Sequence, residues 1–409
     1  MERDTPLHHP KSFENGVDYE HFSHLRKNNP IFKQSHDVYP EGYWNLTRHE
    51  DVVYVSRHSQ IFSSRPHPFL DTEEGRSMDE GDLEFLISLD PPDHTKMRKI
   101  INRGFTPRRV ADLEDKIQAT VDRLLDDVAG QKGCDLVNDI AVELPLQVIA
   151  DLVGVPPEDR HYIFELTEAT FGFDQTVPAE ERQAAATKMY AYADQMCEIR
   201  KEQPMDDLIS IILHAEIDGE KLTQLQIDLF FMLLQNAGSE TTRNLITSGT
   251  LALLNHPDQL EMLLNDHSLI PSAVEELLRY TTPVMQFKRT PLEDTEVGGQ
   301  KIAAGEPIVM WYCSANRDED AFENADGLDI TRDPNLHVSF GAGGPHFCLG
   351  ASLARMEAKI MFRELLTRVK DLELDAEQES LPRVWSNLID GYAKMPIRWS
   401  DVTEKVPTS

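Results

Sequence analysis

The run of residues between Thr223 and Pro257 constrains the fold of this chain more than any other feature. Thr223 is a good N-terminal capping residue, and Asn255-His256-Pro257 is typical of a helix end. About 32 helical residues at 1.5 Å each span roughly 48 Å, enough to cross a whole domain. The apolar residues cover every face of this helix: Leu225, Ile227, Leu229, Phe230, Phe231, Met232, Leu233 and Leu234. A helix that is apolar all round is buried, so the fold must be built around it.

The middle of this predicted helix is polar. It reads Ala237-Gly-Ser-Glu-Thr-Thr-Arg243. Gly238 weakens a helix, and a threonine hydroxyl can bond back to a carbonyl one turn earlier. A polar, locally distorted turn inside a buried helix costs stability, which is typical of functional sites. The alternative is a polar seam whose groups are satisfied by neighbouring helices.

A second constraint is the glycine-rich loop Phe340–Ala351, which holds Cys348. A helix-forming run, Ser352 to Leu366, follows at once. Backbone N–H groups and a helix N-terminus therefore converge on the thiol, and both lower a thiol's pKa. A thiolate held in this way can ligate a metal. The alternative is that Cys348 is an inert, small buried residue.

Helical periodicity dominates from about Asp93 to Tyr280, and the whole pattern is mostly α with small β-sheets. No composition break marks a boundary, so residues 1–409 are predicted to form a single domain. Besides the long helix, we expect helices at Asp93–Arg103, Arg108–Ala129, Leu144–Leu152, Pro157–Thr170, Ala179–Glu202, Met205–Ala215, Pro257–Asp266 and Pro271–Tyr280. We expect short β segments at Tyr43–Leu46, Val52–Val55, Phe287–Thr290, Glu296–Val297, Ile308–Met310 and Ala393–Arg398.

The composition excludes several classes of protein. The net charge of −31 argues against nucleic acid as a partner. No stretch approaches 18 apolar residues, so no membrane span is expected, and the N-terminus lacks the apolar core of a signal peptide. The four cysteines have no paired spacing, so we expect neither a disulfide framework nor a zinc site, and we predict a cytoplasmic protein.

One basic run stands out against the negative charge. Between Lys96 and Arg109 there are six basic residues and no acidic ones. A local positive patch on a negative protein can steer an acidic partner. The alternative is an ordinary solvated helix face.

Three motifs occur in a distinctive order: the Ala237–Thr242 turn, Glu276-Leu-Leu-Arg279 and the loop with Cys348. Together with Asp90–Arg98 and Ser314–Asp318, this set resembles the cytochrome P-450 family of haem-thiolate monooxygenases, over nearly the whole chain. It is most similar to the soluble bacterial type that depends on a ferredoxin. The resemblance implies a single triangular domain with the long central helix over haem b (iron protoporphyrin IX).

The resemblance also implies roles for individual residues. Cys348 matches the proximal thiolate ligand of the haem iron, and a thiolate donates electron density that favours O–O cleavage. Five further positions match the family's haem-binding residues: His94, Arg98, Arg289, His346 and Phe340. Buried propionates need charge-assisted hydrogen bonds of the kind that arginine and histidine make. Glu276, Arg279 and Arg332 match an ion network that serves folding and not chemistry.

Glu240 and Thr241 match the family's acid–alcohol pair, in which the hydroxyl and the carboxylate deliver protons to bound oxygen. This pair favours an O₂-dependent monooxygenase. The alternatives are a peroxide-driven haem oxygenase, whose members usually lack the pair, and a non-catalytic haem-binding sensor.

The cysteine loop departs from the commonest family pattern by one extra residue, within Gly343-Gly344-Pro345. A longer loop is similar to those of bacterial members that act on steroid side chains and branched lipids. Phe287–Thr290 and Val309–Tyr312 indicate the same group. Steroids, terpenoids and branched lipids are therefore the expected classes of substrate.

The resemblance places substrate contacts in apolar segments, which imply a hydrophobic small molecule. These segments carry Phe69, Phe85, Leu86, Phe164, Phe171, Phe173, Val284, Met285 and Leu388. No flavin or phosphate-binding motif follows the cysteine loop. We therefore expect a monomer that uses O₂ and takes electrons from a ferredoxin and an NAD(P)H-dependent ferredoxin reductase. Lys96–Arg109, with Arg355 and Lys359, is the predicted docking face.

Overall fold

The computed structural model describes residues 6–36, 38–71, 85–171, 177–216 and 219–405. It is mostly helical with small sheets, which confirms the predicted fold class. The chain divides into two compact units. Unit 1 contains Met1–Thr95, Ser272–Cys348 and Arg383–Gly391, and unit 2 contains Lys96–Pro271, Leu349–Pro382 and Tyr392–Ser409. The single domain stays a prediction.

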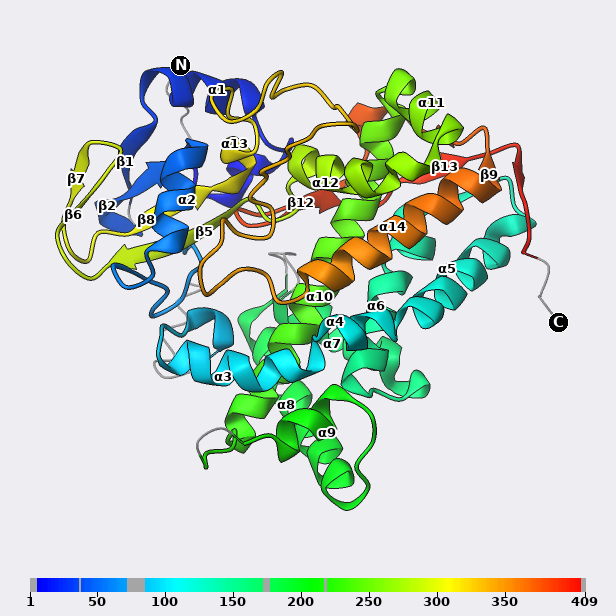
Figure 1. Ribbon diagram of the computed structural model, residues 1–409, viewed down its shortest axis with the longest axis horizontal. Helices are drawn as coiled ribbons and strands as arrows, with labels where there is room; N and C mark the ends of the chain where they lie inside the picture. Colours follow the sequence, from blue (N-terminus) through cyan, green and yellow to red (C-terminus); the bar gives the residue numbers. More distant parts are fainter. Residues whose placement is uncertain (1–5, 37, 72–84, 172–176, 217–218, 406–409) are drawn as a thin grey trace. The chain divides into compact units, whose positions relative to one another are not determined.

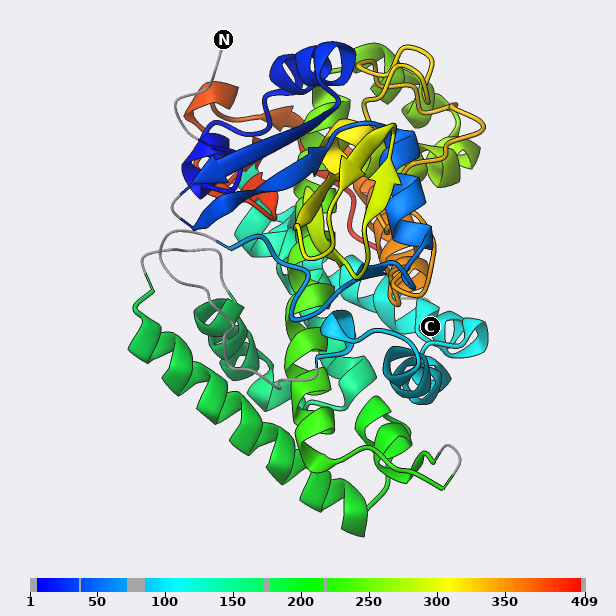
Figure 2. The same cartoon turned by 90° about the vertical axis from the view of Figure 1, so that its left-hand side faces the viewer.

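Unit 1 is organised on a five-stranded sheet in the order β1-β2-β8-β5-β3. Its strands are β1 (Ile31–His36), β2 (Tyr39–Leu46), β8 (Ile308–Trp311), β5 (Gln286–Pro291) and β3 (Phe62–Ser63). β2 and β8 pair in parallel, with Asn45 opposite Val309, and the other pairs are antiparallel. Figure 2 shows β1 and β2 as the two paired blue arrows.

The remaining elements of unit 1 are short. The helices are η1 (Pro10–Phe13), α1 (Tyr19–Asn28), α2 (His49–Arg57), η2 (Leu86–Ser88), α12 (Ile270–Thr281) and α13 (Tyr312–Ala315). Two-stranded pairs are formed by β6 (Thr295–Val297) with β7 (Gln300–Ile302), and by β11 (Arg383–Trp385) with β12 (Asp390–Tyr392).

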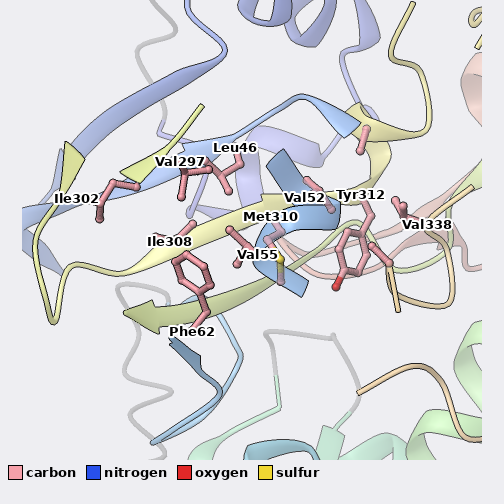
Figure 3. Packing of buried hydrophobic residues seen from close by; sticks show 12 residues of the cluster. Leu46, Val52, Val55, Phe62, Val297, Ile302, Ile308, Met310, Tyr312 and Val338 are labelled. Atoms are coloured by element: carbon pink, nitrogen blue, oxygen red, sulfur yellow. The ribbon is translucent and has the colours of Figure 1, made fainter. Parts of the chain in front are cut away.

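One of the apolar cores of unit 1 lies between α2 and the sheet. Val52 and Val55 of α2 pack with Leu46 of β2 and Met310 of β8, and all four are at most 1% exposed. Figure 3 shows these side chains gathered with Phe62. This core fixes the C-terminal end of α2, on which the cysteine loop rests.

Unit 2 is built around the long helix α10 (Gln224–Leu254). Thr223 and Gln226 form a reciprocal capping box at its start, which satisfies two backbone N–H groups. Most of its apolar side chains are buried, as predicted, but Leu225 in the first turn is 49% exposed and Leu233 is only partly buried. Helices α6 (Glu143–Val153), α7 (Arg160–Phe171), α8 (Ala179–Glu202) and α14 (Ala351–Arg368) all contact it.

Other helices and small strands complete unit 2. The helices are α3 (Asp93–Ile101), which begins in unit 1, η3 (Asn102–Gly104), α4 (Pro107–Ala111), α5 (Glu114–Ala129), the π-helical η4 (Leu136–Ala141), η5 (Pro157–Asp159), α9 (Leu208–His214), α11 (Pro257–Asn265), η6 (His267–Leu269) and η7 (Gln378–Ser380). The strands are β4 (Gly133–Asp135), β9 (Val369–Lys370), β10 (Glu373–Leu374), β13 (Pro396–Arg398) and β14 (Asp401–Val402). Figure 1 shows α5 and α14 running side by side.

One predicted strand is wrong. Val52–Val55 lies in α2, a helix. The valines suggested a strand because β-branched residues favour extended backbone. In the structure Val52 and Val55 stand one turn apart and are both buried, while Tyr54 is exposed, which is the pattern of a helix packed on one face.

Candidate functional site

The cysteine loop rests on α2, and close packing explains its glycines. A Cβ on Gly344 would lie 2.3 Å from the Ser56 carbonyl oxygen, so no side chain fits there. Gly341, Gly343 and Gly344 also have φ between 79° and 93°, which strains other residues. The Arg57 Nε donates a hydrogen bond of 3.2 Å to the Ala342 carbonyl. The segment that carries the extra residue is therefore the part of the loop that touches α2.

The thiol of Cys348 is presented at the end of this loop. The backbone N–H of Cys348 donates to the Phe340 carbonyl at 2.9 Å, which closes the loop behind the sulfur. Cys348 and the neighbouring Phe347 are exposed, and α14 begins three residues later at Ala351. Phe340 is half-buried, with its ring 6.5 Å from that of Phe347. A thiol exposed within its own unit, just before a helix, suits metal ligation.

The two predicted haem-binding histidines lie together in unit 1. The rings of His94 and His346 are 4.2 Å apart, and His346 Nε2 lies 3.1 Å from the hydroxyl of Ser64. The Ser64 backbone N–H donates to Asp90 at 2.8 Å, which ties this segment to the residues just before α3. Arg98 lies one helical turn after His94 on α3 and is partly buried.

Arg289 is a buried cation of β5. Its guanidinium donates 2.7 Å to the Lys288 carbonyl, and no carboxylate of the described residues forms an ion pair with it. Burial lowers the pKa of Arg289 because the charged form loses solvation. A buried guanidinium in this state fits an anionic group such as a carboxylate.

The polar turn of α10 contains a buried ion cluster. Glu240 is paired with Arg243, whose guanidinium also lies 3.9 Å from Glu168 on α7. Both pairing groups of α10 are buried, whereas the Glu168 side chain is 39% exposed. Burial raises the pKa of Glu240, and Glu168 adds to this while Arg243 opposes it.

Thr241 stands beside this cluster and is partly buried. Its hydroxyl donates 2.9 Å to the Ala237 carbonyl, one turn earlier, as the sequence predicted. Gly238 has a packing reason as well: a Cβ there would lie 2.4 Å from Ile149 Cδ1 of α6. The turn is therefore held by neighbours on α6 and α7.

The sequence reasoning missed the roles of Arg243 and Glu168. The signal for Arg243 was present, because Glu240 and Arg243 stand three residues apart on a helix, the spacing at which side chains meet. Glu168 gave no such signal, since its neighbour on α10 lies 75 positions away along the chain.

The ion network around Glu276 lies wholly in unit 1. Glu276 accepts from Arg279 at 2.7 and 2.8 Å and from Arg332 at 3.0 Å. The Arg279 guanidinium also donates to the carbonyls of Asn316 and Ala325. Glu276 and Arg279 are fully buried and paired with each other. Because buried charges are costly unless they are paired, this arrangement suits a structural role.

The predicted substrate residues are spread over both units. Val284 forms an isolated β-bridge with Ile389, and Phe69 packs 6.1 Å from Phe287. Met285 is fully buried in a core cluster with Tyr43 and Trp311. Phe85 and Leu86 are also buried, Phe164 and Leu388 are partly buried, and Phe171 ends α7. Phe173 lies outside the described residues.

Comparison with known proteins identifies the family. The sequence model of the cytochrome P450 family matches residues 170–383. The chain is 40% identical to a steroid C26-monooxygenase of Rhodococcus jostii (strain RHA1) over 387 residues, which are 92% of this chain and 82% of that relative. It is also 40% identical to a methyl-branched lipid omega-hydroxylase of Mycobacterium tuberculosis (strain H37Rv) over 366 residues, 88% of this chain and 84% of the relative. The chain belongs to the cytochrome P450 family.

Comparison with solved structures leads to the same family. A Mycobacterium marinum cytochrome P450 in complex with pseudoionone matches with a TM-score of 0.89 and 34% identity, over 98% of this chain and 99% of that one. A Bacillus megaterium cytochrome P450 in complex with testosterone matches with a TM-score of 0.83 and 33% identity, over 94% and 99%. The protein is thus a monooxygenase that carries haem b, and the Cys348 thiol and the buried Arg289 fit a haem with its iron and propionates.

Among the described residues, no helix is both long enough and apolar enough to cross a membrane.

Proposed function

We propose that this monooxygenase hydroxylates the end of a branched alkyl chain on a steroid or a methyl-branched lipid, with electrons from a ferredoxin. The observation that carries this proposal is the identity of 40% to two relatives with different substrates but a similar position of attack. C26 of a steroid and the omega carbon of a lipid are both chain ends. A pocket in which the branched end of the substrate enters first would account for both positions of attack.

The proposed roles follow from the site. Cys348 ligates the haem iron, and Arg289, His346, His94 and Arg98 bind the propionates, with Phe340 packed beside the loop. When bound, the haem supplies the activation of O₂. Thr241 holds a proton at its hydroxyl oxygen, and the Glu240 carboxyl passes protons to it from the side of Glu168. Burial favours the protonated form of Glu240, which suits a proton donor near neutral pH.

The ligation is tested by the difference spectrum of the reduced, CO-bound protein. We expect the red-shifted Soret band of thiolate-ligated haem, and its loss in Cys348→Ala. Cys313→Ala is the matched control, because that thiol is buried in a core of unit 1. A band typical of histidine ligation in the unchanged protein would refute the role of Cys348.

The substrate is tested with a ligand panel scored by the shift of the haem from low to high spin. The panel compares a steroid with a branched side chain, a methyl-branched fatty acid, a terpenoid and an unbranched fatty acid of equal length. We expect the branched ligands to bind best and their products, formed with O₂, NADPH, a surrogate ferredoxin and its reductase, to carry the new hydroxyl at the chain end. Turnover with peroxide alone, or binding without turnover, would favour the two alternative functions.

A further inference from the structure

The basic run of unit 2 has acidic neighbours that the sequence did not indicate. Arg109 on α4 forms an ion pair with Asp206. Lys96 Nζ on α3 lies 3.9 Å from Glu220 Oε2, and Arg103 donates 3.4 Å to the Glu216 carbonyl. Three of the six cations between Lys96 and Arg109 therefore bond to positions between 206 and 220 of the same chain.

The segment that carries Asp206 is held in place by buried contacts. Asp207, next to Asp206, is buried and paired with Arg200, and its carboxylate caps α9 by accepting from the Ser210 N–H at 2.8 Å. Leu208 on α9 packs directly on η3, where a Cβ on Gly104 would lie 2.2 Å from its Cδ1. The contact between α9 and the basic run is thus part of the folded unit and not a chance meeting of long side chains.

The other cations of the predicted docking face are differently placed. Among the described residues, none forms an ion pair with Lys99, Arg108 or Lys359, and Lys99 and Arg108 are exposed. Lys359 lies one turn before Arg363 on α14, and Arg363 is bonded to Gln118 on α5. The face therefore contains two sets of cations: an engaged set, Lys96, Arg103 and Arg109, and an available set, Lys99, Arg108 and Lys359.

The strength of the engaged contacts decides whether an acidic partner can displace them. Asp206 and Glu220 are 88% and 76% exposed, and exposed ion pairs contribute only about 0.2–1 kcal/mol each. An arriving acidic protein can therefore displace them. The net charge of −31 repels such a partner at long range. The affinity for it therefore depends on the available cations of this face.

We propose that Asp206 and Glu220 compete with the acidic electron donor for Lys96 and Arg109, and so weaken its docking on this face. The proposal rests on the proposed function, in which a ferredoxin docks here. The available set makes the first contacts with the donor, and the engaged set joins when the donor displaces Asp206 and Glu220. The acidic pair thereby keeps the complex short-lived, which suits a donor that must leave after each electron.

The test is a binding titration of the haem-loaded protein with an acidic plant-type [2Fe–2S] ferredoxin as the probe, at low salt. Asp206→Asn with Glu220→Gln should tighten the dissociation constant about two- to thirtyfold, the range expected when two exposed pairs are removed. The gain should vanish at about 0.5 M NaCl, where such charges are screened.

The matched control is Asp258→Asn with Glu261→Gln on α11. This variant removes the same total charge from exposed acids of unit 2 that form no ion pair with a lysine or arginine among the described residues. It should tighten binding much less. Equal tightening by both double variants would reduce the effect to net charge and overturn the proposal.

A third variant separates this proposal from the proposed function. Arg108→Glu with Lys359→Glu should weaken binding of the ferredoxin if it docks on this face. If these reversals weaken binding but neutralising Asp206 and Glu220 changes nothing, the competition is wrong and the docking face stands. If the reversals leave the affinity unchanged, the docking face itself is wrong.

Discussion

The carboxyl group of Glu357 is buried in α14, and among the described residues nothing hydrogen-bonds its Oε2. Burial alone raises the pKa of Glu357 from 4.5 to about 8, because no neighbouring cation offsets the lost solvation. The group therefore holds its proton in the native protein near neutral pH.

Glu357→Gln should change the pH dependence of stability. Between pH 4.5 and about 8 the unfolded chain loses this proton and the native protein keeps it, so native stability falls as pH rises through that window. Glutamine resembles the protonated acid and cannot ionise. The variant should therefore be more stable than the parent near the top of the window, by on the order of 3 kcal/mol.

Urea unfolding at several pH values across the window measures this effect. The control is Glu261→Gln, an exposed acid on α11, which should leave the slope of stability against pH unchanged. A parent and a Glu357→Gln variant with parallel curves would show that the buried carboxyl is compensated.

At the scale of residues, the sequence predicted what local chemistry determines. Helix α14 follows closely after Cys348, and the Thr241 hydroxyl bonds back to the Ala237 carbonyl, as helix geometry allows. Ion pairs between residues of different elements could not be predicted from the sequence. Glu168 meets Arg243, and Asp206 meets Arg109, only because separate helices pack together.

At the scale of elements, the packing of α10 at Gly238 depends on the close approach of α6. Gly238 is poor for helix formation, yet the absence of a side chain lets Ile149 fill the space against α10. The cost in helix propensity is offset by packing.

Gly238→Ala should destabilise the protein although alanine is the better helix former. Alanine contributes about 1 kcal/mol of propensity, but the clash with Ile149 costs about 1–3 kcal/mol. Ile149→Ala removes both of the atoms that lie closest, Cδ1 at 2.4 Å and Cγ1 at 2.5 Å, so the double variant should lose less stability than the two single changes added together.

Thermal and urea unfolding of the three variants measure the coupling. Gly130→Ala, at the end of α5, is the matched control, because nothing lies within 4 Å of a Cβ there. It should be neutral or slightly stabilising. Strict additivity between Gly238→Ala and Ile149→Ala would contradict the packing argument.

Hydrophobic periodicity was enough to predict the long helices but not all of the short elements. Long helices such as α8 and α10 match their predicted bounds closely, because their patterns and caps run over many turns. The predicted helix Arg108–Ala129 is divided into α4 and α5 around Asp112 and Leu113. Strand β1 was not predicted although it pairs with the adjacent β2, because Ile31–His36 lacks the regular alternation of apolar and polar residues that indicates a strand.

The whole molecule carries a net charge of −31, and its acids far outnumber its bases. Such an excess destabilises a compact state through self-repulsion. Many pairs are local compensations, such as Arg368 with Asp122 and Asp126, but they leave most of the excess uncancelled.

Salt should therefore stabilise the protein. Raising NaCl from about 10 mM to 200 mM shortens the Debye length several-fold, and the unfolding midpoint should rise by a few degrees. Calorimetry with and without salt measures the shift, and the Asp258→Asn, Glu261→Gln variant should respond less. A midpoint that falls with salt would mean that attractive pairs outweigh the repulsion.

The division of unit 1 among three separate stretches of chain has a consequence for biosynthesis. Asn387 bonds to the carbonyls of His8 and Leu70, and Ile389 bridges to Val284. The contact between Asn387 and His8 joins residues that are 379 positions apart along the chain. During synthesis the segments around His8 and Leu70 therefore lack these partners until the residues near Asn387 have left the ribosome, and surface exposed during such a delay is a target for chaperones.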